Sequence, residues 1–377
     1  MKNILIVSHD ASRTGAPILL LRLLNHIRQK NIFNFKIILG KDGALRQKFE
    51  ELGDTYVCPM KDDPKYRGNN MVTAIAKRLD YIKDEKKFKD QIRKNLETSD
   101  TILLNSIGSA RLLKYLNGFK GKFISYIHEL EFALTYYAQP GDSRTLIERT
   151  DLFLVPCNTV KNNLIKQFSI ADNKIRQLNY LLEQCPSTAH PEKAGNDIII
   201  CSCGSTDWRK GFDLLSQTAW SLFKKRKKKD FQFVWIGGAE NSASVFQAKL
   251  ELRNMGISDL VSFVSENDNV QDHLSRADLF FLPSKEDPYP VVVLEAASKQ
   301  IPTICFEHGG GIVEFVEEDA GWIVPFMDID AVTDKIIYLM NNQDELKQKG
   351  KRALEKLALR HSAGKVTEQL NSILSAP

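Results

Sequence analysis

The segment 279–305 constrains the fold more than any other stretch of this chain. Four apolar residues, LFFL at 279–282, end at Pro283 and predict a buried strand, which a polar loop at 285–290 follows. Residues 291–299 then predict a helix, and residues 303–306 predict a second buried strand. A strand, a loop, a helix and a strand in this order form a βαβ unit, which requires a parallel sheet covered by its helix.

The same alternation of short apolar runs and helical patterns continues along the whole chain. Further strands are predicted at 4–7, 35–39, 101–104, 123–127, 152–155 and 174–178, and then at 198–203, 231–236, 261–264 and 322–324. The fold class predicted is therefore α/β, with two Rossmann-like doubly wound parallel-sheet domains facing across a cleft. The predicted divisions are a first domain at 1–182, a Pro-, Ser- and Gly-containing linker at 183–197, a second domain at 198–360, and a C-terminal helix at 361–377 that could pack back on the first domain.

Composition and charge exclude several classes of protein. A chain of 377 residues that is 43% hydrophobic and 26% charged is typical of a globular protein with two domains. No apolar run reaches the length of a membrane span, and MKNILIVSHD predicts a first strand and not a signal peptide. Six scattered cysteines without metal spacing make the cytoplasm the expected location. A net charge of +5 suits an anionic ligand or membrane surface and does not indicate nucleic acid binding.

Three carboxylates lie in or beside the loop of the βαβ unit. Glu286 and Asp287 follow the carboxyl end of a strand, where open α/β sheets bind their ligands. Glu295 lies about one turn into the next helix, whose N-terminus attracts anions. A solvated loop and a favourable first-turn charge are the simpler interpretation of the same residues.

Backbone donors are expected at two turns of the second half. Because proline has no N–H, the nearest donors at the helix start are those of Tyr289, Val291 and Val292, on either side of Pro290. The segment IIICSCGSTDWRKG gathers N–H groups and cations after a strand, through Gly204, Ser205, Arg209 and Lys210. It does not satisfy the P-loop pattern.

The segment PSKEDPYPVVVLEAA resembles the signature of the retaining family-4 (group 1) glycosyltransferases. This signature consists of an acidic residue, seven intervening residues and a Glu. Asp287 and Glu295 have this spacing, with Asp in place of the more usual Glu, and Glu286 is one position out of register. Lys210 and the following glycine are similar to the Lys-Gly pair of the family. Gly204 precedes Ser205 where the family has Arg, so Arg209 is the expected substitute.

The resemblance implies roles for these residues. Lys210 and Arg209 would grip the diphosphate of a nucleoside-diphosphate sugar, Asp287 would bind a hydroxyl of the transferred sugar, and Glu295 would hold the ribose diol. The chain near Val264 would border the base, and the glycines at 309–311 would let the backbone approach the ligand or its loop closely. Whether Asp287 or Glu286 is the first acid of the motif stays open.

The first half offers fewer signals. Gly15 follows the first strand and is the only glycine where a dinucleotide site has three, so the chain predicts no NAD site. It could let the backbone approach a phosphate or sugar, or merely provide a turn of positive φ before Pro17 at the first helical position. His128 ends a buried strand where the family has a His beside the transferred sugar. Asn105 and Asn158 occupy similar strand ends and are candidates for acceptor contacts or helix caps.

Other charged segments have simpler interpretations. The triplet Asp328-Ile329-Asp330 resembles a metal-binding D-x-D, but it opens a predicted helix and is interpreted as a cap. Two basic stretches, 77–94 and 223–229, could contact an anionic membrane, although a solvated helix is the favoured interpretation of both. In the first stretch, Leu79, Ile82, Phe88 and Ile92 are expected to form one apolar face.

The function implied by the resemblance is that of a metal-independent retaining glycosyltransferase of the B-type fold without a cofactor. It would move a sugar from a nucleoside-diphosphate sugar to a glycan or lipid-linked acceptor, in surface polysaccharide or glycolipid synthesis. It would act in the cytoplasm, peripherally at the inner face of the membrane if a basic stretch binds there. A sugar-nucleotide epimerase of the same fold and a non-catalytic nucleotide-sugar-binding protein are the alternatives.

Overall fold

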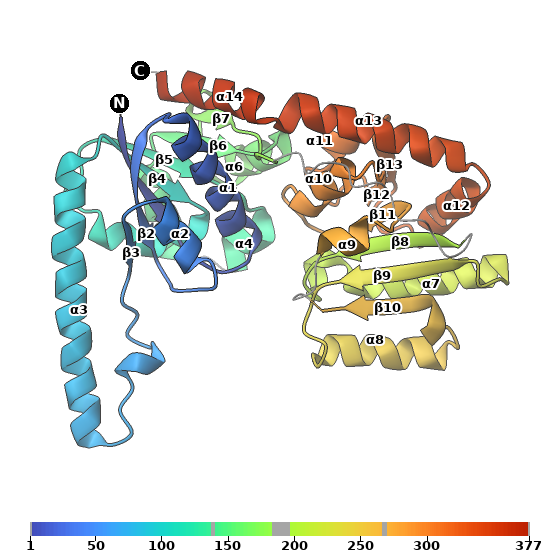
Figure 1. Cartoon of the computed structure of the whole chain (residues 1–377), viewed down its shortest axis with the longest axis horizontal. Helices are drawn as coiled ribbons and strands as arrows, with labels where there is room; N and C mark the ends of the chain where they lie inside the picture. Colours follow the sequence, from blue (N-terminus) through green and yellow to red (C-terminus); the bar gives the residue numbers. More distant parts are fainter. Residues whose placement is uncertain (1, 137–139, 183–196, 266–269, 376–377) are drawn as a thin grey trace. The chain divides into compact units, whose positions relative to one another are not determined.

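The computed structural model describes residues 2–136, 140–182, 197–265 and 270–375. By its contacts the chain divides into two compact units, Met1–Leu181 with Gln369–Pro377 (unit 1) and Leu182–Glu368 (unit 2) (Figure 1). Of the predicted linker at 183–197, residues 183–196 lie outside the described part of the chain.

Unit 1 is built on a seven-stranded parallel sheet in the order β3-β2-β1-β4-β5-β6-β7. Its strands are β1 (Asn3–Ser8), β2 (Asn34–Leu39), β3 (Thr55–Val57), β4 (Thr101–Asn105), β5 (Lys122–Tyr126), β6 (Leu152–Val155) and β7 (Ile175–Gln177). The strand order reverses at β1, which pairs with both β2 and β4, as in a Rossmann fold. The prediction missed only β3 among the described strands, because its three residues are half-buried and too few to form an apolar run.

The helices of unit 1 are α1 (Gly15–Lys30), α2 (Arg46–Leu52), α3 (Met71–Thr98), α4 (Glu131–Tyr136), α5 (Pro140–Arg149) and α6 (Asn158–Phe168), with the 3₁₀ helix η2 (Ile107–Tyr115). The last part of α14 (Ala363–Ser375) also belongs to this unit. Its residues Leu370 and Ile373 line a small apolar cavity together with Ile4, Ile6 and Leu23. The C-terminal helix therefore contributes to the core of unit 1.

Unit 2 is built on a six-stranded parallel sheet in the order β10-β9-β8-β11-β12-β13. Its strands are β8 (Ile198–Cys203), β9 (Phe231–Ile236), β10 (Val261–Val264), β11 (Leu279–Leu282), β12 (Thr303–Phe306) and β13 (Gly321–Val324). Its helices are η4 (Trp208–Lys210), α7 (Phe212–Arg226), α8 (Ala243–Asn254), α9 (Val270–Leu274), α10 (Val291–Ser298), α11 (Val313–Val316), α12 (Ile329–Met340) and α13 (Gln343–His361). The two sheets confirm the predicted pair of Rossmann-like doubly wound domains.

Alternation along the strands decides which side chains fill each layer of unit 2. Phe231, Phe233 and Trp235 alternate along β9 and are at most 1% exposed, in one core with residues of α7, α8 and α12. Phe280 of β11 belongs to the opposite face and is also fully buried. Because both faces are covered by other elements, the strands are apolar at nearly every position, which is why they were predictable.

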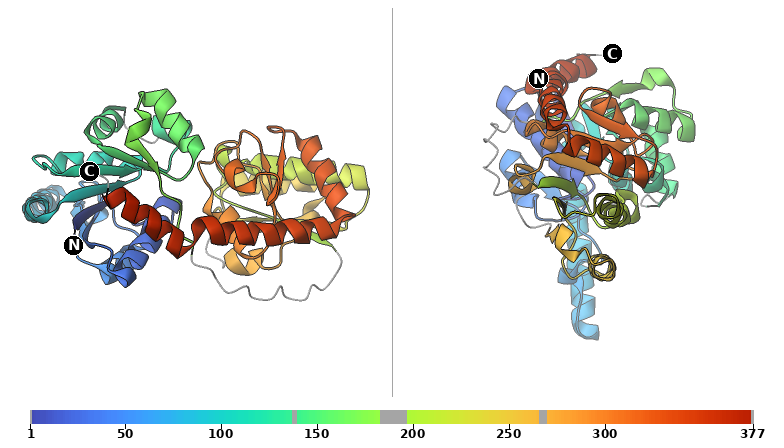
Figure 2. Two further views of the ribbon diagram at one scale, coloured as in Figure 1. Left: turned by 90° about the horizontal axis from the view of Figure 1, so that it is seen from above. Right: turned by 90° about the vertical axis from the view of Figure 1, so that its right-hand side faces the viewer.

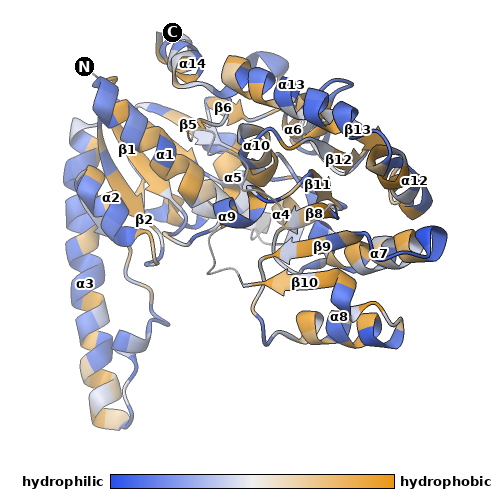
Figure 3. Ribbon diagram, turned by 45° about the vertical axis from the view of Figure 1, so that its right-hand side comes forward, coloured by the Kyte–Doolittle hydropathy of each residue, from blue (hydrophilic) through white to orange (hydrophobic). Residues whose placement is uncertain are grey.

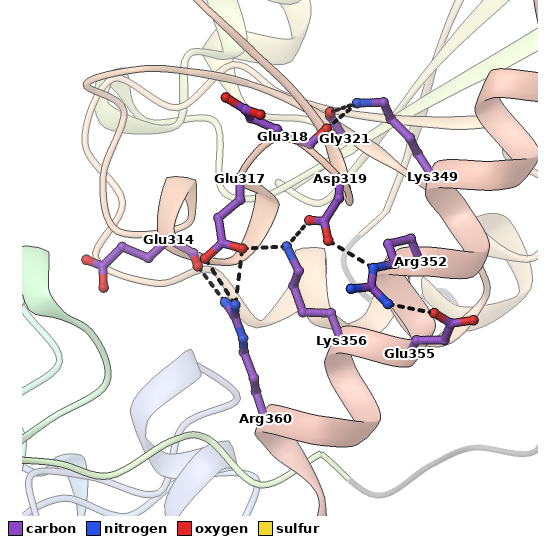
Figure 4. Close-up of polar contacts among 10 residues, drawn as sticks. All are labelled: Glu314, Glu317, Glu318, Asp319, Gly321, Lys349, Arg352, Glu355, Lys356 and Arg360. Carbon is purple, nitrogen blue, oxygen red and sulfur yellow. Dashed lines mark hydrogen bonds and ion pairs between the residues drawn. The ribbon is translucent and has the colours of Figure 1, made fainter.

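A cluster of ion pairs fastens α13 to the turn between α11 and β13 (Figure 4). The Lys356 side chain is only 6% exposed, and its Nζ donates to Glu317 at 2.8 Å and also to Asp319. Arg360 donates to Glu317 at 3.0 Å, and Arg352 donates to Asp319 at 2.9 Å. Burial by itself would raise the pKa of both carboxyl groups, but these hydrogen bonds outweigh it and hold each pKa below its ordinary value.

We expect Lys356→Ala to lower the free energy of unfolding by about 1–3 kcal/mol, because it leaves two neighbouring carboxylates without their shared buried donor. The measurement is urea unfolding at pH 7, with Lys347→Ala as the control. Lys347 lies on the same helix but is 78% exposed, so its removal should change stability by less than about 0.5 kcal/mol. The carboxylates with lowered pKa stabilise the fold at neutral pH and lose this contribution as the pH falls through their pKa, so the two variants should converge in acid. Equal stability of both variants at pH 7 would contradict the role assigned to the cluster.

Candidate functional site

Lys210 and Asp287, which the sequence motifs place in two different turns, form an ion pair beyond the carboxyl ends of β8 and β11. The Lys210 Nζ lies 2.5 Å from Asp287 Oδ2, although the residues are 77 positions apart. The side chains are 16% and 5% exposed. A charged hydrogen bond that is largely removed from water is stronger than a surface pair, so this contact holds both turns together.

The acidic loop is also tied to η4 and α7 through its neighbours. The backbone N–H groups of Lys285 and Glu286 both donate to the carbonyl oxygen of Arg209, at 2.7 and 3.2 Å. The Lys285 Nζ donates to both carboxylate oxygens of Asp213 at 2.8 Å. These contacts give the loop a defined position relative to Lys210, and sequence reasoning missed Lys285 and Asp213 because neither belongs to a motif.

The glycine turn at 309–311 packs against the backbone of the acidic loop. Asp287 N donates to Gly309 O at 2.8 Å, and Gly311 N donates to Asp287 O at 3.3 Å. Gly310 has φ 135°, and a Cβ added there would lie 1.7 Å from Asp287 O. The glycines therefore allow a close approach to the loop, one of the two uses expected for them.

Ser205 and Arg209 both lie against Asp207, a residue that the motifs did not identify. Ser205 Oγ donates to Asp207 Oδ2 at 2.7 Å, and Arg209 Nε lies 3.7 Å from Asp207 Oδ1. Gly204 lies beside the aliphatic part of Lys210, because a Cβ added to it would come within 3.2 Å of Lys210 Cδ. The structure thus brings the four predicted residues of this turn together.

The remaining acids differ in their surroundings. Glu295 is half-buried on α10, and its charge adds to the effect of burial in raising the pKa of Cys203, at the end of β8, to about 12. Glu286 is half-buried, whereas Asp287 is buried and paired. Of the two candidates for the first acid, Asp287 is therefore the one in direct contact with Lys210.

The expected backbone donors lie at the start of α10. Pro290 is its N-cap residue, and Val291 and Val292 are its first two residues, so their N–H groups have no acceptor within the helix. The Tyr289 side chain is 7% exposed, and its hydroxyl forms a 3.2 Å hydrogen bond with His361 Nε2. Val264 O accepts from Gly237 N at 2.9 Å at the end of β10.

In unit 1, His128 and Asn105 form one hydrogen-bonded group with Tyr180. His128 Nε2 lies 2.8 Å from Asn105 Oδ1, and His128 Nδ1 lies 3.1 Å from the Tyr180 hydroxyl. Asn105 Nδ2 donates to the carbonyl of Ala16 at 3.1 Å, which orients the amide so that its oxygen faces the imidazole. Nε2 must then carry the proton, and Nδ1 accepts from Tyr180. Sequence reasoning missed Tyr180 because it follows the last short strand outside any motif.

The other candidates of unit 1 are placed less distinctively. Gly15 is the first residue of α1 and has no positive φ, so the turn interpretation is wrong, as is the placement of Pro17 at the first helical position. A Cβ added to Gly15 would meet nothing within 4 Å. Asn158 is exposed and is the first residue of α6, after the N-cap Cys157, so the cap interpretation is wrong for Asn158.

The D-x-D triplet is accounted for by local structure in unit 2. Asp328 is the N-cap of α12, and its Oδ1 accepts from Ala331 N at 2.9 Å. Asp330 forms an ion pair with Lys225 at 3.0 Å. The interpretation as a cap is confirmed for Asp328.

We expect the His128 ring to stay neutral between pH 8 and 5, because burial, and to a smaller extent the neighbouring His9, lowers its pKa from 6.5 to about 3. In the unfolded chain His128 binds a proton near pH 6.5, whereas in the folded chain it stays unprotonated until about pH 3. The free energy of unfolding therefore decreases as the pH falls from about 6.5 towards 3. The measurement is ¹⁵N NMR of the histidine side chains, with the His128 signal assigned from a His128→Gln variant. A protonated His128 at pH 6 would contradict the assigned hydrogen bonds.

Comparisons with known proteins match part of the chain to a family and the whole chain to a fold. The sequence model of the family described as Glycosyl transferases group 1 matches residues 187–356. The chain is 28% identical over 145 residues to N-acetyl-alpha-D-glucosaminyl L-malate synthase of Bacillus anthracis, over 38% of this chain and 37% of that protein. It is 24% identical over 281 residues to the putative colanic acid biosynthesis glycosyltransferase WcaL of Escherichia coli (strain K12), over 71% and 68%. The alignments to three curated relatives span 37%, 54% and 68% of their lengths.

Solved structures share the fold along the whole chain. The Anabaena protein Alr3699/HepE in complex with UDP has a TM-score of 0.79 at 15% identity and covers 100% of both chains. The lipopolysaccharide outer core galactosyltransferase WaaB has a TM-score of 0.73 at 13% identity and covers 99% of both chains. These likenesses confirm the predicted fold, two parallel-sheet α/β domains of the glycosyltransferase-B type. Residues 187–356, which hold the Lys210–Asp287 pair, are the part of this chain that matches the group 1 glycosyltransferase family.

Proposed function

We propose that the protein is a metal-independent retaining glycosyltransferase that moves a sugar from a nucleoside-diphosphate sugar to a glycan or lipid-linked acceptor. The observation that carries this proposal is the Lys210–Asp287 pair, held beyond the carboxyl ends of β8 and β11. Unit 2 would bind the donor and unit 1 the acceptor. The names of two relatives, from colanic acid and lipopolysaccharide core biosynthesis, support a role in surface polysaccharide or glycolipid synthesis. The protein would act in the cytoplasm.

The chemistry needs positive charge where the diphosphate leaves. When the bond between the anomeric carbon and the phosphate oxygen breaks, the electron pair stays on the phosphate. The acceptor oxygen forms the new bond on the same face of the sugar, and its proton passes to the leaving phosphate oxygen. Lys210, Arg209 and the first N–H groups of α10 would stabilise the charge on the diphosphate, because they are held in place before the reaction.

Asp287 would have two roles in this arrangement. In the described structure it holds the Lys210 ammonium at the ends of the strands, and in the complex it would accept a hydrogen bond from a hydroxyl of the transferred sugar. A phosphate oxygen beside Lys210 would then share an ammonium that is already in position. Glu295 would hold the ribose diol from α10.

His128 would act through its neighbours in unit 1. Both ring nitrogens are occupied, by Asn105 and by Tyr180, and the ring is neutral at physiological pH. We therefore assign it a positioning role, in which it holds the fully buried amide of Asn105 and so keeps the end of β4 in place. Asn158, exposed at the start of α6, remains a candidate for acceptor contact.

The function is tested by incubating the purified full chain with a panel of nucleoside-diphosphate sugars, with and without glycan or lipid-linked acceptors, in EDTA. The panel begins with UDP-glucose, because Alr3699/HepE was solved in complex with it. We expect nucleotide release that depends on an acceptor and survives the chelator. Isomerisation of the donor without an acceptor would indicate an epimerase, and binding without turnover would indicate a non-catalytic protein. Activity that EDTA abolishes and Mn²⁺ restores would contradict the metal-independent mechanism.

We expect Lys210→Ala to lower kcat by about 10²-fold or more, because the variant loses a cation that acts on the charge developing in the transition state. The matched control is Lys225→Ala, which removes another lysine paired with aspartates in unit 2, at the far end of α7. The control should keep wild-type turnover, and circular dichroism should report the same fold for both variants. Normal turnover of Lys210→Ala would mean that the diphosphate binds elsewhere.

The two neighbouring acids should respond differently to removal of their charge. We expect Asp287→Asn and Glu295→Gln to impair transfer strongly, the second chiefly by raising KM for the donor, and Glu286→Gln to be mild. The reason is that Asp287 contacts Lys210, whereas Glu286 lies half-buried beside it. Steady-state kinetics on the three variants measures this. A severe Glu286→Gln and a nearly normal Asp287→Asn would place Glu286 as the first acid of the motif.

A further inference from the structure

Helix α3 of unit 1 has 28 residues, and only its second half is packed against the unit. The buried residues of the helix are Phe88, Ile92 and Asn95. Its first half projects beyond the sheet, with only the loop before it alongside (Figure 1), and Figure 2 shows the same projection from a second direction. Among the described helices, none is long and apolar enough to cross a membrane.

The projecting half carries large apolar side chains in contact with water. Five residues form what we call the apolar stripe: Met71 (81% exposed), Val72 (77%), Ile75 (58%), Leu79 (61%) and Ile82 (51%). At 3.6 residues per turn they lie on one side of the helix, over a length of about 17 Å. In Figure 3 the projecting half of α3 carries both hydrophobic and hydrophilic colours.

The prediction that Leu79, Ile82, Phe88 and Ile92 form one apolar face of this helix is wrong. Leu79 and Phe88 are nine residues apart, which is two and a half helical turns, so they lie on opposite sides. Phe88 is 6% exposed and faces the unit, while Leu79 is 61% exposed. One side of α3 is thus used for packing in the second half of the helix, and a different side is left uncovered in the first half.

The stripe belongs to an ordered part of the helix and not to a frayed end. Asn70 and Thr73 form a reciprocal capping box at the helix start, with Asn70 Oδ1 accepting from Thr73 N at 2.9 Å. In the preceding loop, the Tyr66 hydroxyl donates to Asp84 at 2.7 Å, and the Tyr66 ring meets Tyr81 edge to face at 5.3 Å. Both of these contacts are made on the side of α3 away from the stripe.

Basic residues continue the side of the stripe towards the second half. Lys86 and Lys89 follow Leu79 and Ile82 by seven residues each, so they lie on the same side. Residues 77–94 contain eight basic and four acidic residues. A stripe of apolar side chains continued and flanked by lysines is typical of a helix that lies in the interface of an anionic bilayer.

A second copy of the chain is a less suitable partner for the same surface. Val72, Ile75, Leu79 and Ile82 have the 3-4-3 spacing of a coiled-coil seam. However, the seam covers only two heptads and then continues through Lys86 and Lys89, which a parallel copy would oppose with its own lysines. The surface of an anionic membrane, by contrast, can bind both the apolar stripe and the lysines that continue it.

The other basic stretch, 223–229, does not have these properties. Lys225 pairs with Asp330 and Asp334, and Lys229 pairs with Asp259 at 2.7 Å. Their charge is therefore largely offset within unit 2. Lys89 of α3 is also paired, with Glu85 at 3.3 Å, so the decisive difference is that the exposed large apolar residues of the described chain include none at 212–229. Of the two basic stretches, we therefore expect only the one in α3 to contact a membrane.

We propose that the apolar stripe of α3, together with Lys86 and Lys89, binds a surface of anionic phospholipid. The apolar side chains would enter the boundary between headgroups and acyl chains, while the lysines contact the phosphates. The inference concerns a surface outside the donor site, and it stands whether or not the proposed transferase activity is found.

The test is cosedimentation of the full chain with vesicles of phosphatidylcholine alone and of equimolar phosphatidylcholine and phosphatidylglycerol, at low and high salt. We expect binding to the anionic vesicles that salt weakens. Ile75→Ser with Leu79→Ser should lower the partition coefficient by about tenfold or more, and so should Lys86→Glu with Lys89→Glu. The matched control is Leu359→Ser on α13, which removes a leucine that is 70% exposed elsewhere and should leave binding unchanged.

Circular dichroism and the thermal midpoint should be unchanged in the serine variant, because its side chains make little contact within the fold. Wild-type binding that is absent, equal for both kinds of vesicle, or insensitive to the stripe substitutions would overturn the proposal. Light scattering of the protein without vesicles gives the remaining outcome. A wild-type dimer that the serine variant converts to a monomer would assign the stripe to contact between two copies, and would also overturn the proposal.

Discussion

The Lys210–Asp287 ion pair is the interaction on which the arrangement of the unit 2 site depends. It joins the turn after β8 to the loop after β11, and the glycine turn at 309–311 packs against the same loop. Three segments from separate parts of the chain are therefore held by this pair, by the Lys285–Asp213 pair and by a few backbone hydrogen bonds. Removal of either partner would leave a poorly solvated charge, which costs more than loss of a surface pair.

The pair also explains how the site could be ready for an anionic ligand before one arrives. A lysine free in solution loses much side-chain freedom when it binds a phosphate. Here Asp287 has already restricted the Lys210 side chain and lies against its ammonium, so little further ordering is needed. The arrangement stabilises charge by position, as the proposed transfer without a metal requires.

Unit 1 uses a different physical device at its strand ends. His128 is buried and neutral, and it is held between Asn105 and Tyr180 without an ionic partner among the contacts described for it. A neutral imidazole of this kind orients the Asn105 amide without adding a positive charge to unit 1. The two units thus contribute unlike chemistry, a fixed cation in unit 2 and a neutral hydrogen-bonding group in unit 1.

The sequence by itself determined the βαβ alternation, because a strand covered on both faces must be apolar at nearly every position, and this pattern is local. It also placed Lys210, Asp287 and His128 in the segments after their strands and Glu295 in the helix that follows, because these positions depend only on the order of elements along the chain. Only the tertiary structure decided that Lys210 pairs with Asp287, that His128 meets Tyr180, and that the side of α3 holding Phe88 is the one packed against unit 1. These facts depend on which elements become neighbours, and neither helical period nor motif spacing carries that information.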